Sequence, residues 1–110
     1  MIIDQEILNY PYKSYYFYIE NFYFLDEITR LKLFEQIIKS DYYLFQITKR
    51  ILNESEKDLL VNRILEKGKY KFINLIKQSQ TLNEDQINKI DSLTVFGKLT
   101  GDLDKIEEEI

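Results

Sequence analysis

Apolar residues recur at helical spacing along most of the chain, beginning just after Asp26. The first stripe consists of Ile28, Leu31, Phe34 and Ile38. Four later stripes consist of Leu44, Ile47 and Ile51; Leu60, Val61, Ile64 and Leu65; Phe72, Ile73 and Ile76; and Ile87, Ile90 and Leu93. Spacings of three and four residues place side chains on one face of a helix. Because isolated helices shorter than about 12 residues are marginal in water, these segments must pack on one another, which predicts an all-α fold.

Residues that favour helix starts mark the boundaries of these segments. The candidate caps are Asp26, Ser40, Ser55 and Asn83, whose side chains accept hydrogen bonds from a first helical turn. Asp58 lies three residues after Ser55, and Gln86 lies three residues after Asn83, as in a capping box. Gly68 suits the position just past a helix end. The marks predict about five to seven short helices in helix-hairpin pairs.

The spacing of these marks indicates a repeat of two helices. Residues 42–49 and 70–77 align at an offset of 28 residues. A repeated helix hairpin would stack into a short solenoid or a compact bundle. A small helical bundle without any repeat shows similar spacing, so both interpretations stay open.

The stretch before Asp26 is rich in aromatic residues, with nine of the sixteen between Tyr10 and Phe24. One face of a helix over residues 15–24, capped by Ser14, would carry Tyr15, Tyr18, Ile19 and Phe22. The alternative is a hairpin of residues 15–19 and 22–25. Its turn, Glu20-Asn21, is a poor two-residue turn because nothing there favours a positive φ at both positions. We therefore predict the helix.

The length of 110 residues, 45% of them hydrophobic, predicts a single helical domain over residues 1–110. Residues 1–13 form an N-terminal arm in this prediction, and those before Pro11 are either extended or a short extra helix. Residues 97–110 form a short acidic segment, either a last helix capped by Asp102 or a frayed tail. No apolar run is long enough for a membrane span, and the first nine residues lack the positive start of a secretory signal, so we expect a cytoplasmic protein.

The chain contains no cysteine and no histidine. Thiolate and histidine nucleophiles, disulfides and the commonest zinc ligands are therefore excluded, and we expect neither an enzyme nor a cofactor. The carboxylates near the end of the chain lack the spacing of a calcium loop, so we expect no metal site. A net charge of −4 argues against nucleic acid as a ligand. The lysines around Gly68, beside Tyr70 and Phe72, are more simply a solvated helix edge next to core aromatic residues.

Tyrosine is the residue type that points to a partner. The chain has nine tyrosines and no tryptophan, and tyrosine is enriched at protein interfaces. In the pairs Tyr15-Tyr16 and Tyr42-Tyr43, neighbouring side chains on a helix point about 100° apart. One tyrosine of each pair is therefore expected to be exposed.

In its size, acidity, aromatic richness, lack of alanine and lack of catalytic residue types, the chain resembles the immunity proteins of bacterial contact-dependent growth inhibition systems. That resemblance implies an inhibitor that binds a cognate toxin domain, often a basic nuclease, through protein–protein contact. The alternatives are a helical-repeat adaptor and a phage-encoded inhibitor of a host defence complex. The first candidate contact residues are Glu54, Glu56, Asp58, Tyr42 and Tyr43. The second set is Asp102, Asp104, Glu107 and Glu108.

Overall fold

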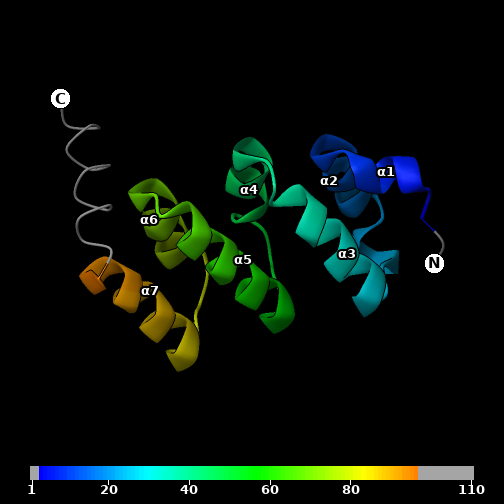
Figure 1. The fold of residues 1–110 in the computed structure, drawn as a ribbon. Helices are drawn as coiled ribbons and strands as arrows, with labels where there is room; N and C mark the ends of the chain where they lie inside the picture. Colours follow the sequence, from blue (N-terminus) through cyan, green and yellow to red (C-terminus); the bar gives the residue numbers. More distant parts are fainter. Residues whose placement is uncertain (1–2, 97–110) are drawn as a thin grey trace. The chain divides into compact units, whose positions relative to one another are not determined.

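The computed structural model describes the backbone of residues 3–96 and the side chains of residues 3–92. Over this part the chain is built from seven α-helices and contains no strand (Figure 1). The helices are α1 (Gln5–Asn9), α2 (Pro11–Glu20), α3 (Glu27–Ile37), α4 (Asp41–Ile47), α5 (Glu54–Lys67), α6 (Tyr70–Ser79) and α7 (Glu84–Phe96), with a 3₁₀ turn η1 (Phe22–Phe24) between α2 and α3. The prediction of an all-α protein of short helices is confirmed.

The contacts within the chain divide it into two compact units, Met1–Arg50 and Ile51–Ile110. Unit 1 contains α1 to α4, and unit 2 contains α5 to α7. The sequence pattern predicted a single domain over the same residues.

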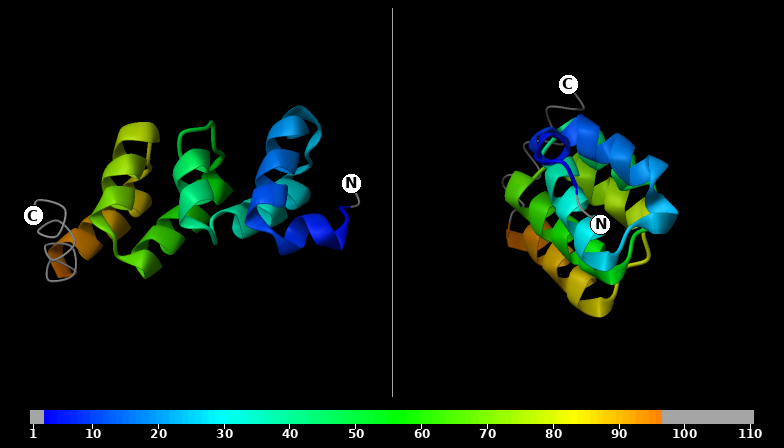
Figure 2. Two further views of the ribbon diagram at one scale, coloured as in Figure 1. Left: turned by 90° about the horizontal axis from the view of Figure 1, so that it is seen from above. Right: turned by 90° about the vertical axis from the view of Figure 1, so that its right-hand side faces the viewer.

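In unit 1, α2 packs along α3, α1 contacts both of them, and α4 also contacts both. The core of this unit holds the fully buried side chains of Tyr18, Leu33, Phe34, Ile37, Leu44 and Ile47. In unit 2, α5 and α7 lie side by side and run in the same direction, since α6 returns the chain between them (Figure 2). Its core holds Leu60, Val61, Ile64, Phe72, Ile73, Ile76 and Ile90.

Of the two alternatives for the residues before Pro11, an extended arm and a short extra helix, the structure shows the helix. Asp4 caps α1 by accepting the backbone N–H of Glu6 at 3.0 Å. Pro11 is the first residue of α2, because its fixed φ and missing N–H suit that position. Ser14 therefore lies inside α2 rather than capping it. Its Oγ donates to the carbonyl of Ile7 at 2.7 Å, which ties α2 to α1.

The aromatic stretch is helical, as predicted, rather than a hairpin. The α-helix ends earlier than expected, at Glu20, where Asn21 donates its side-chain N–H to the Phe17 carbonyl at 3.0 Å. The chain then continues as η1. Of the face predicted to point inward, Tyr18 is fully buried, and Tyr15 and Phe22 are half-buried.

Helices α3, α5 and α7 begin with the same arrangement of residues. In each, a leucine precedes the capping residue, which accepts a hydrogen bond from the backbone N–H three residues later. The three pairs are Asp26 and Thr29 at 2.7 Å, Asn53 and Glu56 at 2.8 Å, and Asn83 and Gln86 at 2.8 Å. The caps lie 27 and 30 residues apart, so the chain uses one kind of helix start three times.

Equivalent positions in these helices are also buried alike. The residues three and seven positions after each cap are all buried: Thr29 and Leu33, Glu56 and Leu60, Gln86 and Ile90. In the sequence alignment at an offset of 28, Leu44 corresponds to Phe72 and Thr48 corresponds to Ile76, and all four residues are buried. These equivalences support the predicted repeat of helix pairs.

Two predicted caps need correction. Ser55 lies inside α5, whose capping box is formed by Asn53 and Glu56 instead. Ser40 occupies the cap position of α4, but its side chain makes no capping hydrogen bond. Asn83 with Gln86 forms the predicted capping box, and Gly68 has the left-handed conformation (φ 62°) that ends α5. The Oδ1 of asparagine accepts this hydrogen bond as well as the Oγ of serine does, so the sequence pattern alone did not decide between Asn53 and Ser55.

Three residues of the predicted apolar stripes are exposed. Ile28 is 71% exposed, Ile51 is 83% exposed and Ile87 is 41% exposed. The inward face of α3 begins one residue later, at Thr29, and continues through Leu33 and Ile37. Ile51 lies in the connection before α5 rather than on a helix.

A candidate protein-binding surface of tyrosines on α2 and α4

Four tyrosines from two helices of unit 1 gather into one cluster, here named the tyrosine surface: Tyr15 and Tyr16 on α2, and Tyr42 and Tyr43 on α4. Tyr43 is at its centre, with ring centroids 4.9 Å from Tyr42 and 5.1 Å from Tyr15. Tyr16 lies 6.4 Å from Tyr43 and 5.5 Å from Tyr15. Most of these rings meet at steep angles, the edge-to-face geometry that aromatic rings prefer.

The exposure of these rings matches the expectation from the sequence. Tyr16 is 54% exposed and Tyr42 is 64% exposed, whereas Tyr15 and Tyr43 are half-buried. One tyrosine of each neighbouring pair thus faces solvent, and the other packs under it. Burial raises the pKa of the Tyr43 phenol, and the neighbouring phenols of Tyr16 and Tyr42 raise it further.

Two further tyrosines extend the aromatic area along α2. Tyr10 and Tyr12 are each nearly half exposed, and their ring centroids lie 5.8 Å apart. The Lys13 ammonium lies 4.8 Å from the Tyr10 ring centroid and also forms an ion pair with Glu6. The hydrogen bond to Glu6 raises the pKa of Lys13, so that this lysine remains a cation beside the rings.

The predicted acidic contact at Glu54, Glu56 and Asp58 requires a correction. Glu56 is fully buried, and its Oε1 accepts the backbone N–H of Asn53 at 2.9 Å. Its carboxylate is therefore buried in the capping box and cannot contact a partner of the folded protein. The prediction that Glu56 is a contact residue is wrong.

Glu54 and Asp58 connect two helices of unit 2 through hydrogen bonds. Glu54 Oε2 accepts from Asn83 Nδ2 at 3.0 Å and from Gln86 Nε2 at 3.3 Å. Gln86 Nε2 also donates to Asp58 Oδ1 at 2.8 Å. The two carboxylates therefore fasten the start of α5 to the start of α7. Both side chains keep an exposed face, so their role as partner contacts stays a prediction.

The second predicted contact set, Asp102, Asp104, Glu107 and Glu108, lies outside the described residues. Within the described part of the chain, no group of three or more acidic side chains is arranged to hold a metal ion. No helix between residues 3 and 96 is both long enough and apolar enough to cross a membrane.

The lysines around Gly68 flank a core residue. Phe72 is 1% exposed, and the Lys67 and Lys71 ammonium groups lie 5.8 Å and 5.2 Å from its ring centroid. Tyr70 is half-buried. The interpretation of Phe72 as a core residue rather than a base-stacking platform is confirmed.

Sequence reasoning missed a second exposed aromatic feature in unit 1. Tyr23 is 93% exposed and Phe24 is 78% exposed, both in η1, which was assigned to a continuous helix. The signal was present in the run Phe22-Tyr23-Phe24, since three consecutive aromatic side chains cannot all face one core.

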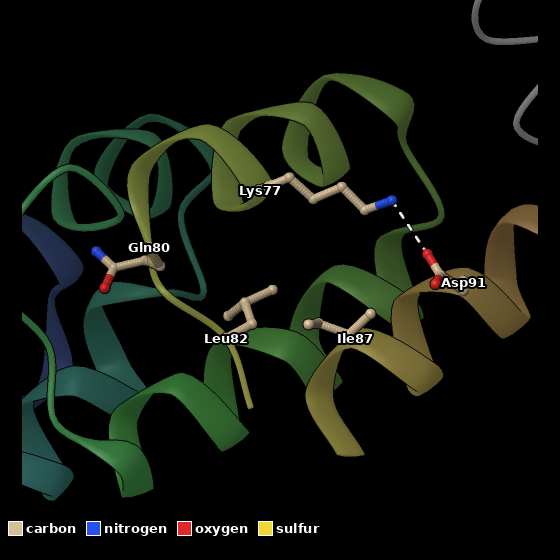
Figure 3. A pocket seen from close by; sticks show the side chains of 5 residues that line it. All are labelled: Lys77, Gln80, Leu82, Ile87 and Asp91. Atoms are coloured by element: carbon tan, nitrogen blue, oxygen red, sulfur yellow. Dashed lines mark hydrogen bonds and ion pairs between the residues drawn. The ribbon is translucent and has the colours of Figure 1, made fainter. Parts of the chain in front are cut away.

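Unit 2 contains an open pocket that the sequence did not indicate (Figure 3). Its volume is about 260 Å³, and it is lined by Lys77, Gln80, Leu82, Ile87 and Asp91. The Lys77 ammonium lies 3.1 Å from Asp91 Oδ1 and bridges α6 to α7 at one side of the pocket. Leu82 and Ile87 supply its apolar wall.

Comparison with protein-family models, with curated proteins and with solved structures finds no match to this chain.

Proposed function

We propose that this protein is an immunity-type inhibitor, which binds and neutralises a cognate bacterial toxin domain by protein–protein contact through the tyrosine surface. The observation that carries the proposal is the exposure of Tyr16 and Tyr42 above the half-buried rings of Tyr15 and Tyr43. Exposed aromatic area of this kind contributes strongly to binding when a partner covers it.

The packing of the rings favours tight binding. Tyr42 and Tyr16 each rest against Tyr43, at centroid distances of 4.9 Å and 6.4 Å. Side chains already held in place lose little conformational entropy when a partner covers them. Tyrosine also offers a rigid apolar ring and a hydroxyl that can donate or accept a hydrogen bond at the interface.

The charge of the chain favours a basic partner, such as a nuclease domain. With a net charge of −4, the protein attracts a surface that is built to bind phosphate. Electrostatic attraction of this kind raises the association rate more than it raises the affinity. The exposed carboxylates of Glu54 and Asp58 contribute to this field even while they accept hydrogen bonds from Gln86.

The second candidate function is that of a helical-repeat adaptor. The three equivalent helix starts at Asp26, Asn53 and Asn83 favour it, because repeated helix pairs commonly present extended binding surfaces. An adaptor would bind several partners weakly, whereas neutralisation of a lethal enzyme requires one tight complex. A phage-encoded inhibitor of a host defence complex would also form one tight complex.

The test uses the protein domain encoded directly upstream of this gene, purified as a toxin domain. We expect a complex in the nanomolar range, about −12 kcal/mol, and loss of the activity of the toxin. Replacing Tyr16 and Tyr42 together by Ala should speed dissociation and weaken the complex by about 30-fold or more. Ile51→Ala is the control, because Ile51 is an apolar side chain that is even more exposed, at 83%, but lies in unit 2.

Three outcomes separate the candidates. A nanomolar complex weakened by the tyrosine variant and unaffected by Ile51→Ala supports the inhibitor and its surface. A nanomolar complex that the tyrosine variant leaves unchanged rules out the tyrosine surface. Micromolar binding to many unrelated proteins, with no inhibition of the toxin domain, favours the adaptor.

A further inference from the structure

The most exposed large apolar side chains of unit 1 lie within six residues of one another, away from the tyrosine pairs in sequence. Tyr23 is 93% exposed, Phe24 is 78% exposed and Ile28 is 71% exposed. We name these three residues the aromatic turn. Two of them belong to η1 and the third to the first turn of α3. Large apolar side chains that are exposed so close together in the sequence suggest a contact site.

The turn is held in one conformation by its backbone and by the residue that precedes it. The Phe24 N–H donates to the Asn21 carbonyl at 2.8 Å, and the Leu25 N–H donates to the Phe22 carbonyl at 3.5 Å. Phe22 packs against Tyr18, with ring centroids 5.5 Å apart. The side chains of Tyr23 and Phe24 are therefore presented to solvent by a fixed turn, which lowers the entropy lost on binding.

Arg30 contacts two of the residues on which this turn packs, Phe22 and Tyr18. Its guanidinium lies 4.6 Å from the Phe22 ring centroid, and its Nε donates to the Tyr18 hydroxyl at 3.1 Å. The nearest positive charge along α3 is thus directed at the base of the turn rather than at its exposed rings.

Carboxylates flank the aromatic turn in the sequence, and we call them its acidic rim. Residues 20–29 contain three carboxylates and no basic residue, and all three are exposed: Glu20, Asp26 and Glu27. Glu20 ends α2, Asp26 caps α3 and Glu27 is the first residue of α3. Hydrogen bonds from Thr29 lower the pKa of Asp26 to about 2.

We infer that the aromatic turn is a second contact site, and that it binds a protein segment in which lysine or arginine flanks a large apolar side chain. The exposed rings and Ile28 would cover the apolar side chain, while Glu20 and Glu27 pair with the flanking cations. The acidic rim disfavours nucleic acid and anionic lipid, whose phosphates it repels. This inference does not depend on the identity of a toxin or on the tyrosine surface.

The test selects a phage-displayed library of random peptides on the immobilised protein, after depletion on the Tyr23→Ser/Phe24→Ser variant. We expect the surviving peptides to carry a large apolar residue with Lys or Arg beside it. Their affinity for the wild type, measured by fluorescence polarisation, should fall about tenfold or more in the depleted variant. In Glu20→Lys/Glu27→Lys it should fall similarly and lose its dependence on salt.

Controls separate this site from the tyrosine surface and from unfolding. Tyr16→Ser/Tyr42→Ser should bind the selected peptides as the wild type does, since it changes the other surface. Tyr23→Phe keeps the ring and should retain the affinity. Circular dichroism should show unchanged helix content in every variant, because the replaced side chains are exposed.

The inference is overturned if no peptide survives that depends on Tyr23 and Phe24, or if the surviving peptides are neutral or acidic. It is also overturned if the wild type binds vesicles of phosphatidylcholine and phosphatidylglycerol through these two residues, because the site would then recognise lipid. Either result leaves the toxin-domain assay of the tyrosine surface intact.

Discussion

The two units of this chain differ in the side chains that they expose and bury. Unit 1 holds eight of the nine tyrosines and five of the seven phenylalanines, and many of these rings face solvent. Unit 2 holds both complete capping boxes, and its buried Glu56 and Gln86 are fully engaged in hydrogen bonds. In the described residues, every buried polar side-chain atom has a hydrogen-bond partner.

Residue type alone does not mark a contact surface in this chain. Glu56 looked like part of an exposed acidic corner, yet it is fully buried because the Asn53 cap requires an acceptor three residues later. One of Tyr42 and Tyr43 was expected to be exposed, and it is Tyr42, at 64%, because Tyr43 occupies the inward position. Whether a side chain is buried or exposed depends on its position relative to the helix start, which sets the inward face of each helix.

The largest expected effects come from the equivalent core positions of the two units. Leu33 in unit 1 and Leu60 in unit 2 are both fully buried seven residues after a cap. Replacing either by Ala should lower the free energy of unfolding by about 2–5 kcal/mol, because the cavity adds to the lost burial. Urea unfolding followed by tyrosine fluorescence, which reports mainly on unit 1, and by circular dichroism measures both.

We expect the fluorescence midpoint to fall more in Leu33→Ala than in Leu60→Ala, because most contacts of each residue lie within its own unit. Equal shifts of both signals in both variants would contradict the division, since the chain would then unfold as one cooperative body.

The capping box of α5 gives the next largest effect. In Glu56→Ala the Asn53 N–H loses its acceptor at 2.9 Å, which should lower the free energy of unfolding by about 1–2 kcal/mol. Glu56→Gln is the matched control and should cost much less, because the Gln86 side chain fills the same role at Asn83. Equal losses in the two variants would show that the negative charge matters rather than the hydrogen bond.

A smaller effect distinguishes the cap of α3 in unit 1, which is an aspartate where the equivalent caps of α5 and α7 in unit 2 are asparagines. The hydrogen bond from Thr29 lowers the pKa of Asp26 from 3.8 to about 2. The stabilisation is therefore fully present above pH 3.8 and is lost as the pH falls towards 2. Asp26→Asn keeps an acceptor without the titration, so the urea midpoint of the wild type should fall more steeply than that of the variant over this range. Parallel curves would contradict the assignment.

The smallest effect is expected at the ion pair beside the pocket. Lys77 and Asp91 have side chains 44% and 54% exposed, and their charged atoms are 3.1 Å apart. Lys77→Ala should change the free energy of unfolding by less than about 1 kcal/mol, since solvent screens exposed ion pairs. Thermal unfolding at low and high salt measures this change. A decrease in the free energy of unfolding larger than that limit would show that the ion pair is a structural link between α6 and α7.

The sequence was sufficient for the class of fold, because three- and four-residue spacing reports helices directly. It also identified Asp26, Asn83 and Gly68 as helix boundaries, since each acts through its own side chain or backbone. It failed at Ser55 because Asn53, two residues earlier, competes for the same role. It could not place Glu54 beside Gln86, because that contact joins residues 32 positions apart.

The tyrosine surface was partly foreseeable. The angle between neighbours on a helix gave one exposed tyrosine in each pair without saying which, and nothing in the sequence brought Tyr15 to within 5.1 Å of Tyr43. The fixed 3₁₀ turn at Tyr23 was hidden for a different reason. A helical pattern continues through it, and only the side chain of Asn21 and the packing of Phe22 end the α-helix there.

The grouping of contacts in residues 1–50 has a consequence for synthesis on the ribosome. Two partners of the buried Tyr18, Phe22 and Arg30, follow it in the sequence by four and twelve residues. Nascent chains emerge in order from the N-terminus and are made at about 5–20 residues per second, which is slow compared with the packing of neighbouring helices. We therefore expect the first unit to acquire its core, and its outward-facing rings, while the second is still being synthesised.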